Sequence, residues 1–107
     1  MFNRLACSAL LLTVLLQTAA AATEGQVQRG KTLVGANCAT CHAVGRVGAS
    51  PLDVAPAFRD LHTHYPVEDL GEALAEGITT GHPTMPEFRL EPDQITDVVA
   101  YLKSLER

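Results

Sequence analysis

The segment Cys38-Ala39-Thr40-Cys41-His42 constrains the fold of this 107-residue chain more than any other feature. The motif has two thiols three positions apart, followed at once by an imidazole. This pattern has three possible interpretations: a redox dithiol, half of a zinc site, or the attachment point of a haem that is bonded through both sulfurs. Each of these sites requires different residues elsewhere in the chain. The rest of the sequence therefore decides between them.

The N-terminal segment, residues 1–22, has the pattern of a cleaved secretory signal peptide. Arg4 supplies a positive charge, an apolar run covers residues 5–16, and residues 19–22 are all alanine, which suits an A-x-A cleavage site. The apolar run is shorter than the roughly 20 residues of a membrane-spanning helix, so an uncleaved anchor is the less favoured alternative. We expect cleavage after residue 22, a mature domain over residues 23–107, and export to the periplasm.

The cysteine count favours haem over the other two sites. Cys7 lies within the expected signal peptide, so the mature chain has only Cys38 and Cys41. A structural zinc site needs four ligands, and no second Cys or His pair has suitable spacing. A thioredoxin-like dithiol requires a βαβ context, which the sequence lacks. C-x-x-C-H is the attachment signature of c-type haem, and it would place His42 beside the iron as an axial ligand.

Met85 is the candidate for the second axial ligand. It is the only methionine of residues 23–107, and it lies in a loop with prolines on both sides. A thioether is a soft, neutral ligand that raises the reduction potential of a haem iron. Three histidines are the alternative ligands: His62, His64 and His82.

The remaining sequence predicts a small all-α domain with long loops. Apolar residues at helical spacing predict three helices, over residues 26–37, 67–76 and 92–107. Thr23 and Gln26 resemble a capping box before the first helix. The segments between helices are rich in glycine and proline, and none alternates as a strand does. Long loops in so small a domain usually carry function, and here we expect them to wrap the cofactor.

The charge is acidic and uneven. The whole chain has a formal net charge of −4, and residues 65–107 hold nine acidic and three basic side chains. Such a surface disfavours nucleic acid and anionic membrane as partners. The acidic half is either an ordinary solvated surface or a surface that attracts a basic partner.

Residues 26–107 resemble the class I cytochromes c of the small, single-haem bacterial kind. In that family a glycine and a bulky residue of the first helix cross the last helix at an aromatic residue, and Gly30, Val34 and Tyr101 occupy the matching positions. A family proline after the histidine offers its carbonyl oxygen to the second imidazole nitrogen, and Pro56 matches it. The resemblance implies one covalent haem c. It would be attached through Cys38 and Cys41, with His42 and Met85 as axial ligands and Pro56 as the hydrogen-bond partner of His42.

The resemblance also implies a single-electron carrier, not an enzyme, with redox proteins as its donor and acceptor. Two alternatives remain open: a dedicated haem subunit of a periplasmic dehydrogenase, and a haem protein with a labile sixth ligand that acts as a peroxidase or sensor. Many family members place a tryptophan near a haem propionate, and this chain has no tryptophan. Four residues are candidates for that role, and the sequence does not choose between them: Arg46, Arg59, Tyr65 and Arg89.

Overall fold

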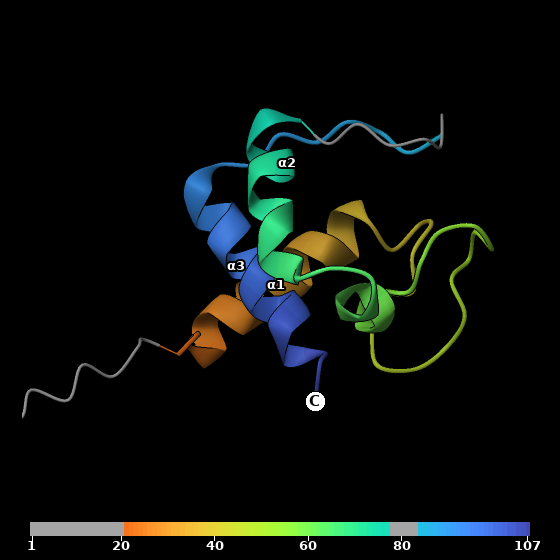
Figure 1. Ribbon diagram of the computed structural model, residues 1–107, viewed down its shortest axis with the longest axis horizontal. Helices are drawn as coiled ribbons and strands as arrows, with labels where there is room; N and C mark the ends of the chain where they lie inside the picture. Colours follow the sequence, from red (N-terminus) through yellow and green to blue (C-terminus); the bar gives the residue numbers. More distant parts are fainter. Residues whose placement is uncertain (1–20, 78–83) are drawn as a thin grey trace, which may run out of the picture.

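The computed structural model describes residues 21–77 and 84–107 (Figure 1). Most of the predicted signal peptide, and His82, lie outside the described residues. The described part contains three α-helices, α1 (Glu24–Asn37), α2 (Leu70–Glu76) and α3 (Pro92–Ser104), and two 3₁₀ helices, η1 (Phe58–Thr63) and η2 (Val67–Asp69). No strand occurs in these two ranges, and the predicted all-α class is confirmed.

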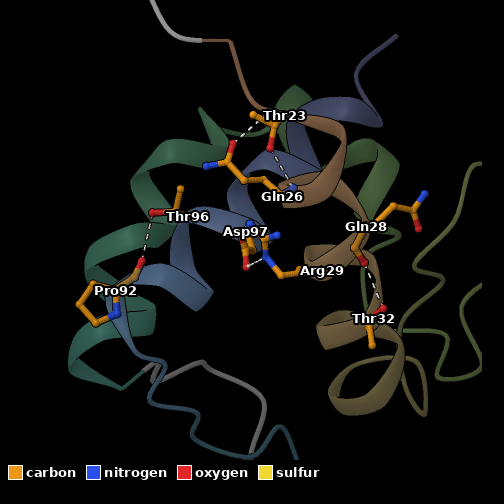
Figure 2. Close-up of polar contacts among 8 residues, drawn as sticks. All are labelled: Thr23, Gln26, Gln28, Arg29, Thr32, Pro92, Thr96 and Asp97. Atoms are coloured by element: carbon orange, nitrogen blue, oxygen red, sulfur yellow. Dashed lines mark hydrogen bonds and ion pairs between the residues drawn. The ribbon is translucent and has the colours of Figure 1, made fainter.

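A capping box formed by Thr23 and Gln26 marks the start of helix α1. The Thr23 hydroxyl accepts a hydrogen bond from the Gln26 backbone N–H at 3.2 Å, and the Gln26 side chain accepts one from the Thr23 backbone N–H at 2.9 Å (Figure 2). These bonds satisfy two donors that the first turn of a helix leaves unpaired. The predicted capping box is therefore confirmed, and the helix begins two residues earlier than the apolar spacing alone suggests.

The crossing of α1 and α3 forms the centre of the domain (Figure 1). A Cβ atom built on Gly30 would lie 2.8 Å from the Tyr101 Cβ and 2.6 Å from the Asp97 carbonyl carbon. Only a residue without a side chain lets the two backbones approach this closely. Val34 and Tyr101 are buried beside the crossing, so the contact expected from the family resemblance is confirmed.

An ion pair between the exposed Arg29 and the buried Asp97 joins the two helices at the same crossing. The Arg29 guanidinium donates from Nε to Asp97 Oδ2 at 2.9 Å and from Nη2 to Oδ1 at 3.2 Å (Figure 2). The Asp97 carboxylate is buried, and two donors in a planar fork satisfy both of its oxygens. The aspartate hydrogen-bonds to the guanidinium and holds the pKa of Arg29 above its usual value.

The middle of the chain departs from the sequence prediction in two places. The predicted helix over residues 67–76 is divided into η2, a single 3₁₀ turn, and the α-helix α2. Helix η1 was not predicted, because its six residues are too few for an apolar period to show. Its buried Leu61 and the buried Val67 of η2 join the core cluster that α1 and α3 form.

The C-terminal end of α3 is tied to the loop that follows the cysteine motif. The Tyr101 hydroxyl donates to the Val44 carbonyl oxygen. Arg46 donates to the carbonyl oxygens of Ser104, at 2.6 Å, and Arg107, at 2.8 Å. Because the last carbonyls of a helix have no partner within it, Arg46 supplies donors at the end of α3 and anchors the loop. Within the described residues, no helix has the length and hydropathy that crossing a bilayer requires.

Candidate functional site

The cysteine motif forms a tight turn at the end of α1. The backbone N–H of Cys38 donates to Val34 O at 2.8 Å, and those of Cys41 and His42 donate to Cys38 O at 3.2 and 2.9 Å. This turn brings Cys38, Cys41 and His42 to the wall of one cavity. Burial raises the pKa of the Cys38 thiol, so less of it is present as the reactive thiolate. This disfavours a redox role for the Cys38–Cys41 pair.

The His42 imidazole is held by the backbone of the following loop. Its Nδ1 lies 2.7 Å from the Pro56 carbonyl oxygen. A carbonyl oxygen only accepts hydrogen bonds, so Nδ1 is the nitrogen that carries the proton in this contact, and Nε2 is the nitrogen that can offer a lone pair. Nε2 is therefore the nitrogen that remains available to a metal.

A second contact orients the same ring. The centroids of His42 and Phe58 are 4.8 Å apart, with the ring planes tilted by 42°. The backbone N–H of Phe58 donates to Ala43 O at 2.9 Å, which holds the start of η1 against the motif. The imidazole thus has a hydrogen bond at one nitrogen and an aromatic ring beside it, and its orientation is set by the protein alone.

The cavity has a volume of about 570 Å³ and is almost entirely apolar. That volume lies within the usual range for a cofactor site. It is bounded by α1, the loop after the motif, η1, α2, the segment before α3, and α3 itself. Among its apolar wall residues are Leu33, Leu52, Leu61, Leu74, Val98 and Leu102.

Met85 belongs to the same wall. It is half-buried, in the segment that returns toward α2, where the Leu90 N–H donates to Leu74 O at 2.9 Å. Pro86 and Leu90 of this segment also line the cavity. Residues far apart in sequence are thereby brought together, and all five predicted site residues line one cavity: Cys38, Cys41, His42, Pro56 and Met85.

The alternative ligands are placed differently. His62 and His64 are exposed and are not in the cavity wall, and His82 lies outside the described residues. Of the four propionate candidates, Tyr65 alone lines the cavity. In the described part of the chain, the group of three or more acidic, His or Cys side chains that a separate metal site would need does not occur.

The sequence analysis missed much of the wall. Phe58 and Leu61 of η1 and Leu52 and Val54 of the preceding loop all face the cavity. Phe58 follows Pro56 by two residues, and an aromatic residue at that distance from the expected imidazole partner could have been suspected. Leu52 and Val54 lie in an irregular loop without a period, so no sequence pattern marks them.

These residues fit a covalently bound haem. The apolar wall suits the face of a porphyrin, the two thiols can form thioether bonds with its vinyl groups, and Nε2 of His42 has a lone pair for iron. A zinc ion would instead require four polar ligands, which this cavity does not offer among its described residues. The donor set therefore matches haem c and matches neither alternative raised by the motif.

Comparison with known proteins agrees with this fit. Residues 27–106 match the protein family described as Cytochrome c. A cytochrome c6 of Limnospira maxima is 36% identical over 86 residues, which are 73% of this chain and 91% of that protein. A cytochrome c-553-like protein of Synechocystis sp. is 30% identical over 87 residues, or 78% of this chain and 73% of that protein.

A longer relative contains a similar segment. The FixP subunit of a cbb3-type cytochrome c oxidase from Bradyrhizobium sp. is 32% identical over 88 residues, which make up 29% of that subunit. No solved structure matches the chain significantly. Cys38, Cys41 and His42 fit the haem-attachment motif of the matched family. The chain thus belongs to the cytochrome c family, the electron carriers with covalently bound haem c.

Proposed function

We propose that this cytochrome is a periplasmic single-electron carrier in which His42 and Met85 are the two axial ligands of the haem iron. The observation that carries the proposal is that both side chains line one apolar cavity together with Cys38 and Cys41. When bound, the haem supplies an iron that alternates between its ferric and ferrous states. Two side-chain ligands would leave no position for a substrate or peroxide.

Each residue then has a defined part. Cys38 and Cys41 would hold the cofactor through thioether bonds during repeated redox cycles. Pro56 accepts the hydrogen bond of His42 Nδ1, which fixes the ring and makes Nε2 a stronger ligand. The thioether of Met85 favours ferrous iron and raises the reduction potential. Imidazole and thioether bind both ferric and ferrous haem iron, so neither ligand needs to leave when the iron changes state.

Features of the sequence support the proposed location and partners. The signal-peptide pattern of residues 1–22 supports export, and haem attachment at C-x-x-C-H takes place outside the cytoplasm. The acidic excess of residues 65–107 supports a donor or acceptor protein with a basic docking surface. The similarity to cytochromes c6 supports a free carrier.

The match to FixP, an oxidase subunit, favours a second candidate: a haem protein bound to one dedicated redox enzyme, such as a periplasmic dehydrogenase. Purification of the untagged protein from its native cells separates the two. A free carrier elutes alone, and a dedicated subunit elutes with its enzyme in a fixed ratio.

Replacement of Met85 by alanine tests the ligation. The haem should stay attached through Cys38 and Cys41, whereas the iron should become high-spin or accept His82. The weak far-red band of a methionine-ligated ferric haem should disappear, and the reduction potential should fall by on the order of 100 mV or more. Carbon monoxide should bind the ferrous variant readily and the wild-type protein poorly.

Leu90→Ala is the matched control, because Leu90 also lines the cavity from the same segment and has no atom that can bind iron. It should keep the far-red band and change the potential much less. If Met85→Ala keeps both the band and the potential of the wild-type protein, Met85 is not a ligand. A wild-type protein that lacks the band and binds carbon monoxide readily would favour the labile-ligand alternative.

A further inference from the structure

Haem c carries two propionate carboxylates, and the cavity offers few polar groups to receive them. An ionised carboxylate placed among apolar side chains without hydrogen bonds is strongly unfavourable. The propionates must therefore lie where the wall meets solvent, close to a hydrogen-bond donor. The polar side chains of the wall determine where this happens.

Besides His42, four described wall residues have polar side chains: Asn37, Thr40, Tyr65 and Thr84. The Asn37 amide already donates to Leu33 O at 2.8 Å. Asn37 and Thr40 also adjoin the attachment cysteines, and the propionates are carried by the pyrrole rings opposite those that bear the bonded vinyl groups. Thr84 adjoins Met85 and already takes part in an interaction of its own.

The three arginine candidates, Arg46, Arg59 and Arg89, lie outside the cavity wall. Arg46 is bound to the end of α3. Arg89 is exposed, and its Nε lies 3.7 Å from Glu87 Oε1. Arg59 has a buried Nη1 without a hydrogen-bond partner. None of the three arginines lies in the cavity wall, so none of them faces the space where the cofactor fits.

Tyr65 has the properties that a propionate donor requires. It follows η1, and its backbone N–H donates to Leu61 O at 3.3 Å, which fixes the start of the side chain. It lines the cavity and is also 37% exposed, so it lies at the rim. Its hydroxyl has no hydrogen-bond partner in residues 21–77 and 84–107. Burial raises the pKa of Tyr65, so the phenol stays protonated and able to donate at neutral pH.

We propose that the Tyr65 hydroxyl donates a hydrogen bond to a propionate of the haem and so takes the position-fixing role for which this chain has no tryptophan. The inference rests on the haem c of the family and on the cavity. It does not depend on Met85 as a ligand. The donor is neutral, so the propionate keeps its negative charge at the rim.

Resonance Raman spectroscopy of the holoprotein tests the proposal, because the propionate-bending band responds to hydrogen bonding of the carboxylate. Tyr65→Phe should move this band to lower wavenumber. Tyr101→Phe is the matched control: it removes the other tyrosine hydroxyl, which is bound to Val44 O away from the cavity, and it should leave the band in place. An unchanged band in Tyr65→Phe, or an equal shift in both variants, would overturn the assignment.

A measurement on the unmodified protein covers the case in which a variant folds poorly. In the ferrous state, the Tyr65 hydroxyl proton should give a slowly exchanging proton resonance with a nuclear Overhauser effect to propionate methylene protons. Absence of that effect for an assigned Tyr65 would refute the hydrogen bond. Failure of the proposed axial ligation is seen separately, as loss of the far-red band from the wild-type spectrum.

Discussion

Replacement of Gly30 by alanine tests the helix crossing on which the domain is built. The added Cβ would lie 2.6 Å from the Asp97 carbonyl carbon and 2.8 Å from the Tyr101 Cβ, whereas ordinary contact begins at 3.4 Å. The helices would have to separate by at least about 0.8 Å to relieve the first contact. The nearest obstructing atom is the Asp97 carbonyl oxygen, which belongs to the backbone of α3, so no side-chain rotation can remove the clash.

The cost should be high for a single methyl group. Overpacking of a well-packed interior typically costs about 1–3 kcal/mol, and a backbone-to-backbone clash places Gly30→Ala at the upper end, about 3 kcal/mol. Separation of the helices would also stretch the Arg29–Asp97 ion pair, which adds to the loss. For a domain of this size, such a change corresponds to a decrease in melting temperature of about 12 °C or more.

Gly35→Ala is the internal control, since Gly35 lies on the same helix and a Cβ there would have no neighbour within 4 Å. Alanine should stabilise that position by about 0.5–1 kcal/mol, because glycine is the poorer helix former. Thermal denaturation of both ferric holoproteins, followed by circular dichroism, gives the comparison. If Gly30→Ala melts within a few degrees of the wild-type protein, the close approach of α1 and α3 is not required.

Two further predictions concern the cofactor and pH. The Cys38→Ala, Cys41→Ala double variant, made without haem, should show no cooperative thermal transition, because the apolar wall of the cavity would be exposed to water without the cofactor. A melt near that of the holoprotein would contradict this. Burial raises the pKa of Tyr101 above its usual value of 10.0, so its contribution to stability is complete below that pH and is lost as pH rises through the folded-state pKa. Urea denaturation should therefore show that the free energy of unfolding falls less between neutral and alkaline pH in Tyr101→Phe than in the wild-type protein. Part of the decrease should remain in the variant, because burial also raises the pKa of Tyr65.

Local sequence determined the features that depend on neighbouring residues. The capping box at Thr23 and Gln26 was predictable because both hydrogen bonds form within one turn. The grouping of Cys38, Cys41 and His42 at one site was predictable because all three lie within the segment 38–42. The hydrogen bond between His42 and Pro56 was expected from the family resemblance, and it is present in the structure.

Features that depend on distant segments were not predictable in the same way. The Arg29–Asp97 ion pair joins residues 68 positions apart, and each of them alone looks like an ordinary charged residue on a helix. The division of the predicted helix over residues 67–76 reflects packing of Val67 into the core, which an apolar period does not resolve. The wall formed by Leu52 and Val54 exists only because the loop folds back, with Leu52 N–H bonded to Cys41 O at 3.0 Å.

The sequence by itself determined the chemistry: two thiols and an imidazole at the spacing of haem attachment, and one thioether within residues 23–107. It also predicted three helices whose apolar faces are too small to form a core without a cofactor. The tertiary structure alone decided which residues face the cofactor. It removed Arg46 from the propionate candidates by binding it to the end of α3, and it placed Tyr65 at the rim of the cavity. The reason is physical: residue types and short spacings fix what a site can bind, whereas burial and long-range hydrogen bonds fix which of several similar side chains is free to bind it.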